Sequence, residues 1–254
     1  MTRRQLLAVA GPAAVALGQR LQFEVASVKP SNSEDRRPFF DFQNAGQFRA
    51  ANVTVRRLIQ TAYRIKDYQI SGGPSWLGSD LYDVTAKPET PPTQEQLMLM
   101  IQSLLAERFQ LVLRRDSKEM PVYGLVVTKN GPKLKAGDES APKIIRVRRG
   151  LLTAPQGNMP MLADQLSNVL GRAVIDRTGL SGRYDLKLEW VPDEYQVAMF
   201  GAMGVPEGFG APPPDWHGPT LFTALEEQLG LRLESQKGSV EMFAIEHIER
   251  PSAN

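Results

Sequence analysis

The feature that most constrains the fold of this chain is a short phrase that occurs twice. Gly78–Pro88 reads "GSDLYDVTAKP" and Gly182–Trp190 reads "GRYDLKLEW", so in both a turn with glycine leads into Tyr-Asp and then into alternating apolar residues. The segments that follow align without a gap, 104–128 over 224–248. A recurring order of elements indicates a duplicated unit. Chance agreement between two similar patterns is the alternative interpretation.

Hydrophobic periodicity predicts the elements of each unit. Apolar residues at helical spacing predict helices at 52–64, from Thr93 to about 109, at 159–170 and at 220–229. Leu105 and Leu225 take the same place in the alignment and are expected to be buried. Alternating apolar residues predict short strands between the helices, and each unit is expected to end in a β-hairpin, at 110–128 and at 231–249.

These elements predict an α+β protein of two related βαββαββ-type units. Mixed or antiparallel sheets are expected to carry helices packed on one face. The first unit is predicted to span residues 22–135 and the second 144–250, within a chain of 254 residues.

The first eighteen residues have the pattern of an export signal. Arg3 and Arg4 precede an apolar run from Leu6 to Leu17, and small residues occupy the third-last and last positions of 1–18. The paired arginines are similar to a twin-arginine signal, and the general export route is the alternative. A short membrane anchor or a buried helix is a further interpretation. The run is shorter than the roughly 20 residues of a membrane span. The chain is therefore expected to be periplasmic or extracellular, and no later segment is predicted to cross a membrane.

Composition argues against several classes of partner and chemistry. The formal net charge is +2, and without Arg3 and Arg4 it is about zero, which gives no reason to propose nucleic acid or an anionic membrane. The chain has no cysteine, which excludes disulfides and thiol catalysis. Its two histidines, His217 and His247, show no metal-ligand spacing, and no nucleotide or nucleophile-elbow motif is present. No metal and no cofactor is expected.

Four carboxylates provide the alternative of an enzyme. Asp83 and Asp185 belong to the repeated phrase, and Asp176 and Glu189 lie near the second copy. A pair of carboxylates can act as general acid and base in a hydrolase. The structural interpretation is that each Tyr-Asp packs its ring on the helices while the carboxylate caps or pairs at the edge of the sheet.

The second unit carries an insertion at about 191–219. It contains "GFGAPPPDWHGP", and such a long segment is expected to be either a binding loop or a mobile flap. Exposed aromatic residues are typical anchors for a partner. The candidate binding residues are Trp76, Trp190, Asp215, Trp216 and His217, and the alternative for Trp216 is that it packs back on its own domain.

The motifs together resemble a family of uncharacterised exported proteins that is expanded in soil acidobacteria. The resemblance rests on "FEVASVKPS", "QISGGPSWLGSDLYDVTAK", "VIDRTGLSGRYDLKLEW" and "ALEEQLGLRLESQKG", and covers almost all of the chain after the leader. It implies export and no established activity. Where such proteins commonly have His before "R-[ED]-[ST]-K-E", this chain has Arg114, which weakens a catalytic role at that position.

A looser similarity, at the level of fold, is to the short N-terminal modules of secretins and TonB-dependent receptors. The segment "LFTALEEQLGLRLESQKGSVEMFAIEHI" has their order of helix, strand, short turn and strand. Those modules bind proteins or pack side by side, which is an argument by analogy. The sequence thus favours a non-catalytic binding or assembly module for a protein or cell-envelope ligand, with a periplasmic hydrolase as the alternative.

Overall fold

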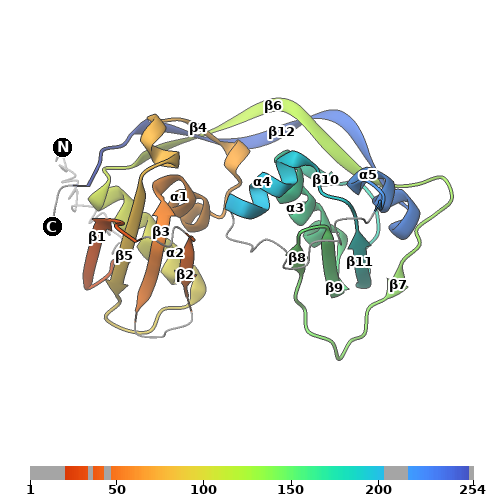
Figure 1. The fold of residues 1–254 in the computed structure, drawn as a ribbon, viewed down its shortest axis with the longest axis horizontal. Coiled ribbons are helices and arrows are strands. Elements are labelled where there is room, and N and C mark those ends of the chain that lie inside the picture. The colour runs from red at the N-terminus through yellow and green to blue at the C-terminus, as the bar shows by residue number, and fades with distance from the viewer. Residues whose placement is uncertain (1–20, 34–36, 43–46, 203–216, 252–254) are drawn as a thin grey trace, which may run out of the picture.

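The computed structural model describes residues 21–33, 37–42, 47–202 and 217–251, which form two lobes joined by two long strands (Figure 1). The strands are β1 Val25–Pro30, β2 Phe39–Asp41, β3 Phe48–Thr54, β4 Ile70–Gly72, β5 Leu81–Lys87, β6 Val112–Val127, β7 Lys135–Ala136, β8 Arg146–Arg148, β9 Leu151–Gly157, β10 Val174–Asp176, β11 Tyr184–Glu189 and β12 Leu231–His247. The α-helices are α1 Val55–Tyr63, α2 Gln94–Arg108, α3 Met159–Leu170, α4 Glu194–Ala202 and α5 Leu221–Ala224, which continues as a π-helical turn, Leu225–Leu229. Two 3₁₀ turns, Asp67–Gln69 and Ser75–Gly78, flank β4.

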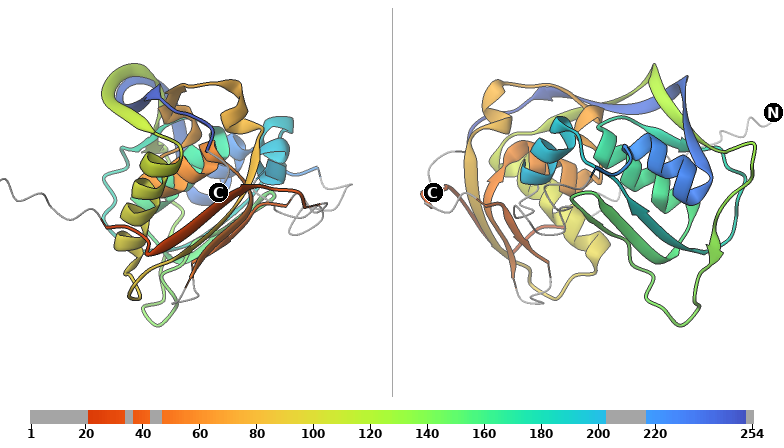
Figure 2. Two further views of the ribbon diagram at one scale, coloured as in Figure 1. Left: turned by 90° about the vertical axis from the view of Figure 1, so that its left-hand side faces the viewer. Right: turned by 45° about the vertical axis from the view of Figure 1, so that its right-hand side comes forward.

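Three four-stranded sheets organise the molecule. The first lobe has the order β1-β5-β3-β2 and the second the order β7-β11-β9-β8, and both are antiparallel. The third sheet, β10-β6-β12-β4, belongs to both lobes, because β6 and β12 run antiparallel across the whole molecule (Figure 2). Helices pack on these sheets, so the predicted α+β class is confirmed.

The pairing of strands repeats between the lobes. Val174 of β10 pairs in parallel with Tyr123 of β6, and Ile70 of β4 pairs in parallel with Phe243 of β12. Tyr123 and Phe243 are the residues that the sequence alignment superimposes. A register shift also recurs where the Tyr-Asp strands pair with their neighbours, in β3–β5 and in β9–β11. This recurrence supports duplication over chance agreement.

The two predicted hairpins are wrong, because each segment is one continuous strand. Residues 112–127 form β6 and residues 231–247 form β12, and the two strands pair with each other from Val112–His247 to Val127–Leu231. The middle of neither segment folds back on itself, so the backbone partners come from the other repeat. The third sheet therefore contains one long strand from each repeat, and each of these strands ends in the opposite lobe.

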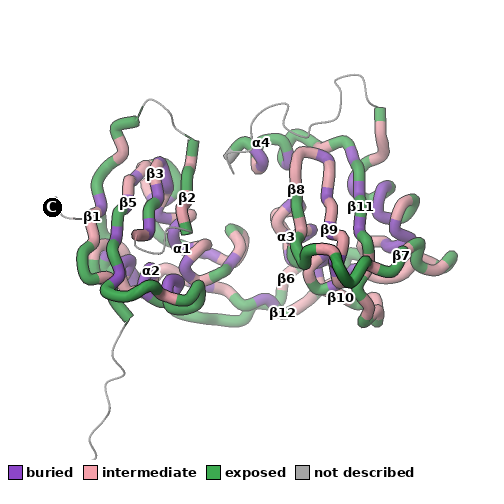
Figure 3. The backbone as a smooth tube through the Cα atoms, turned by 90° about the horizontal axis from the view of Figure 1, so that it is seen from below, coloured by how far each residue is buried: buried purple, intermediate pink, exposed green. Residues whose placement is uncertain are grey.

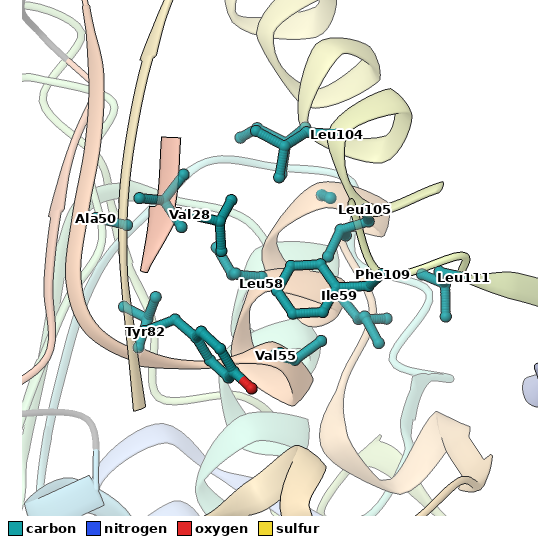
Figure 4. Close-up of a cluster of buried hydrophobic side chains, with 14 of the residues drawn as sticks. Val28, Ala50, Val55, Leu58, Ile59, Tyr82, Leu104, Leu105, Phe109 and Leu111 are labelled. Atoms are coloured by element: carbon teal, nitrogen blue, oxygen red, sulfur yellow. The ribbon is translucent and has the colours of Figure 1, made fainter. Parts of the chain in front are cut away.

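Each lobe has its own hydrophobic core (Figure 3). The first lies between its sheet and α1 and α2, where the ring of Tyr82 meets Phe109 edge to face at 5.4 Å (Figure 4). The second lies between its sheet, α3 and the α5 segment. Leu105 and Leu225 are both fully buried, one in each core, as the repeat predicts.

The predicted insertion is structured in its first part, which corrects the expectation of an irregular loop. Glu194–Ala202 form α4, and Asp193 accepts a hydrogen bond from the backbone N–H of Gln196 at 2.8 Å, as an N-cap does. Phe200 and Gln196 are buried. The Gly- and Pro-rich part at 203–216 lies outside the described residues.

Candidate functional site

A cavity of about 630 Å³ lies between the two lobes and receives residues from both repeats. We call it the inter-lobe cavity. The first repeat contributes part of α1, the turn that follows it and the aromatic segment at β2, while the second contributes the end of α3 and one side of α4. Its lining residues are Phe40, Phe42, Arg57, Gln60, Thr61, Ile65, Lys66, Asp67, Tyr68, Ser167, Asn168, Gly171, Tyr195, Ala198 and Met199.

Helix α1 turns one polar side toward this cavity because its apolar side is fixed in the core. Thr54 caps the helix by accepting from the N–H of Arg57, and Val55, Leu58, Ile59 and Ala62 are buried. The helical period then places Arg57, Gln60 and Thr61 on an adjacent side. The helix ends at Arg64, whose left-handed backbone (φ 54°) redirects the chain into the 3₁₀ turn that carries Tyr68.

Helix α4 forms the wall of the cavity in the second lobe. Its N-terminal Tyr195 is 56% exposed and lies against Gly171, the left-handed residue that ends α3. A Cβ at Gly171 would lie 1.9 Å from the Tyr195 hydroxyl, so glycine is needed for this close approach. Burial raises the pKa of Tyr195, and the carboxylates of Asp67 and Asp193 raise it further.

The two lobes are in polar contact at the cavity. Lys66 Nζ lies 2.7 Å from Asp164 Oδ1, which joins the turn after α1 to α3. Tyr68 also faces α3: burial raises its pKa, the Ser167 hydroxyl lowers it, and Asp164 raises it. Lys66, Tyr68 and Ser167, which take part in these contacts between the lobes, also line the cavity.

Arg57 is the cation that these contacts leave without an acidic partner among the described residues. Lys66 pairs with Asp164, and Asp67 pairs with Arg56 and accepts a hydrogen bond from Gln60. Burial lowers the pKa of Arg57 from its ordinary value of 12.5, and no carboxylate opposes that shift. The inter-lobe cavity therefore presents a partly desolvated guanidinium.

Aromatic residues at β2 form the apolar side of the cavity. The rings of Phe40 and Phe42 are stacked, with centroids 5.6 Å apart and planes inclined by 4°. Phe42 is 42% exposed, and it also borders a second cavity of about 720 Å³ in the first lobe. The second cavity is lined mainly by phenylalanine, proline and leucine from one repeat, and we regard the inter-lobe cavity as the better candidate because it combines both repeats, charge and aromatic surface.

The structure places two of the predicted binding residues, Trp76 and Trp190, in different lobes. Trp190 is fully buried in the second core, where its indole N–H donates to Gln196 Oε1 at 2.8 Å. Trp76 is half-buried on the first core, beneath the guanidinium of Arg250 at 5.1 Å. His217 is exposed. Asp215 and Trp216 lie outside the described residues, and none of the other three predicted residues lines the inter-lobe cavity.

The four predicted carboxylates lie on three different sheets. Asp83 on β5 accepts the backbone N–H of Asn52 at 2.9 Å, and Asp176 on β10 accepts from Thr178. Asp185 and Glu189 are exposed on β11, where Glu189 is 3.1 Å from Lys187. Asp185 and Glu189 are four residues apart on β11, and four residues along a strand span about 13 Å. That is more than the roughly 5–9.5 Å that separates the two carboxyl groups of glycosidases.

Sequence reasoning missed the residues of the inter-lobe cavity. Helix α4 lies in the insertion that was expected to be a binding loop or a mobile flap. The spacing of Asp193 and Gln196 before an apolar pair was a signal for that helix. Arg57 carries no signal of its own, because an arginine on the polar side of a helix is usually solvated.

Two kinds of feature are absent from the described residues. No group of three or more acidic, histidine or cysteine side chains could hold a metal there. No helix in that part of the chain combines the length and apolar character that crossing a membrane requires.

Comparison with known proteins assigns the chain to a family without assigning an activity. The family model described as "Protein of unknown function (DUF3738)" matches residues 56–248, which run from within α1 to the end of β12 and include most of the inter-lobe cavity. No curated protein and no solved structure matches the chain. Because the match covers well over half of its length, the chain belongs to the DUF3738 family.

Proposed function

We propose that this protein is an exported, non-catalytic binding module whose ligand lies in the inter-lobe cavity. The observation that carries the proposal is the composition of that cavity, to which both repeats contribute. It holds exposed aromatic surface, amide and hydroxyl groups, and one guanidinium without an acidic partner among the described residues. Concave sites of about 300–1,000 Å³ with apolar walls and a few polar groups are typical of small-molecule sites.

The polar groups of the cavity suit binding better than catalysis. The Ser167 hydroxyl donates to the carbonyl of Ala163 and accepts the N–H of Val174, each at 2.8 Å, so it is held as a structural group. A nucleophile needs a base within hydrogen-bond reach. The only carboxylate among the described lining residues is Asp67, which Arg56 already binds. Hydrolysis by paired carboxylates is therefore not favoured by any observation.

A neutral hydrophobic dye tests the location of the site. N-phenyl-1-naphthylamine should bind the mature chain saturably, with a rise in fluorescence, because the cavity offers aromatic walls. Ala198→Trp places a large ring in the cavity from an exposed position on α4, and should weaken dye binding about tenfold or more. Val197→Trp is the matched control, because Val197 is the exposed neighbour of Ala198 and does not line the cavity.

The result decides between a site in this cavity and a site elsewhere. Weaker binding in Ala198→Trp alone, with a melting temperature within about 2 °C of the parent chain, supports the proposal. Equal weakening in both variants, or no saturable binding by the parent chain, contradicts it.

Export is proposed from the leader, which lies outside the described residues. Arg3→Lys with Arg4→Lys should trap the unprocessed precursor in the cytoplasm if the twin-arginine route is used. Immunoblots of cytoplasmic and periplasmic fractions measure this, with Arg20→Lys, just beyond the leader, as control. Normal processing of the double variant would exclude that route and leave the general route.

A further inference from the structure

The charges that line the inter-lobe cavity indicate the charge of its ligand. Arg57 and Lys66 are its cations and Asp67 is its anion among the described residues. Lys66 and Asp67 already have partners outside the lining, in Asp164 and Arg56. The charge left to a ligand is therefore the single positive charge of Arg57.

The environment of Arg57 makes an anion the group that gains most there. A partly buried charge without a partner loses hydration and receives no compensation. A carboxylate or a similar planar anion can accept two parallel N–H bonds from a guanidinium, in a charge-assisted pair stronger than a neutral hydrogen bond. Arg57 is carried by α1, whose buried face fixes the helix in the core, so the guanidinium is presented from a rigid element.

The rest of the cavity requires an apolar body next to that anionic group. The stacked rings of Phe40 and Phe42 form one side, and Met199 with the exposed ring of Tyr195 forms the opposite side on α4. A planar aromatic ligand can stack or pack edge to face on such rings. A volume of about 630 Å³ accommodates a small molecule rather than a folded partner.

We infer that the inter-lobe cavity binds a small organic monoanion with an aromatic or bulky apolar body, and that Arg57 binds its anionic group. This inference rests on the proposed function and specifies the chemistry of its ligand. It assigns Arg57 the role of selecting a charged ligand over a neutral one of the same shape.

A matched pair of dyes tests the role of Arg57. 8-Anilinonaphthalene-1-sulfonate carries the body of N-phenyl-1-naphthylamine with one added sulfonate. Arg57→Gln should weaken binding of the anionic dye by about tenfold or more and change binding of the neutral dye less than about twofold. Arg177→Gln, which removes an exposed arginine outside the cavity, is the control and should change neither.

A second measurement on the parent chain needs no variant and covers the case in which Arg57→Gln does not fold. 1-Naphthoate and 1-naphthamide have the same shape and differ in charge. The naphthoate should displace the anionic dye at a concentration about tenfold or more below that of the amide.

The outcomes separate this inference from the proposed function. If Arg57→Gln weakens both dyes equally, or if the two naphthyl compounds compete equally, the anion assignment is overturned while the cavity remains a binding site. If the parent chain binds neither dye, or if Ala198→Trp has no effect on either, the proposed function fails together with the inference.

Discussion

At the scale of single residues, the two repeats form the turn after their second helix with different residues. Gln110 and Gly230 occupy equivalent positions before β6 and β12, and both have a left-handed backbone, with φ of 53° and 65°. Gly230 lies against another segment: a Cβ there would be 2.3 Å from the carbonyl oxygen of Gly131 and 2.8 Å from the backbone nitrogen of Lys133. Gln110 already has a side chain in this backbone conformation. The second lobe therefore requires glycine at this position, and the first lobe does not.

Gly230→Ala should therefore lower the free energy of unfolding by about 1–3 kcal/mol, because it combines a left-handed backbone with a contact that must shift. Gln110→Ala is the matched control and should change stability by less than about 0.5 kcal/mol. Urea denaturation followed by circular dichroism measures both. A loss below about 0.5 kcal/mol in Gly230→Ala would show that neither the left-handed backbone nor the contact with Gly131 constrains this position.

At the scale of elements, each helix of the repeat is positioned by the apolar residues that it buries. Helix α2 begins at a capping box, in which Thr93 and Gln96 satisfy each other's backbone N–H groups, and its buried side includes Leu104 and Leu105. The equivalent helix of the second repeat begins at the cap Thr220 and widens into a π-helical turn at Leu225–Leu229. Each of these helical segments places a fully buried leucine, Leu105 or Leu225, in the core of its lobe.

Leu105→Ala and Leu225→Ala should each cost about 2–5 kcal/mol of stability, since each leaves a cavity in a packed core. Leu99→Ala is the control on α2, where the leucine is 45% exposed, and should cost less than about 1 kcal/mol. Chemical denaturation with an unchanged m-value is the measurement. A loss under about 1 kcal/mol at both core positions would be inconsistent with the packing described.

At the scale of the whole molecule, the shared sheet makes the two lobes one folding unit. β6 begins in the first lobe and pairs with β10 in the second, while β12 begins in the second lobe and pairs with β4 in the first. The third sheet needs both repeats, because β4 of the first pairs with β12 of the second and β10 of the second pairs with β6 of the first. The inter-lobe cavity follows from this arrangement, because the two long strands hold α1 and α3 on facing sides of it.

Unfolding should therefore be a single cooperative transition, although the chain has two hydrophobic cores. In chains that carry Trp216→Phe, Trp190→Phe leaves only Trp76 in the first lobe and Trp76→Phe leaves only Trp190 in the second. Within each variant, the midpoint by fluorescence should coincide with the midpoint by circular dichroism. Two separated transitions would show that the lobes unfold independently.

The sequence by itself determined the local structure of this protein and its repetition. Thr93 is observed before α2 as predicted, whereas the helix predicted at 52–64 begins only at Val55, after Thr54 caps it. The ungapped alignment of 104–128 over 224–248 anticipated that Leu105 and Leu225 are buried at equivalent positions, although the hairpins predicted for these segments were wrong. These features depend on neighbouring residues and on which side of an element is apolar.

Only the tertiary structure decided which strands pair and which polar residues meet. A segment of alternating residues such as 112–127 is equally compatible with a hairpin and with one long strand, and its partner in β12 is far away in the sequence. Phe42 and Arg57 belong to the first repeat and Tyr195 to the second, and none of them is distinctive alone. They line one cavity because β6 and β12 exchange ends between the repeats, which brings the two lobes together.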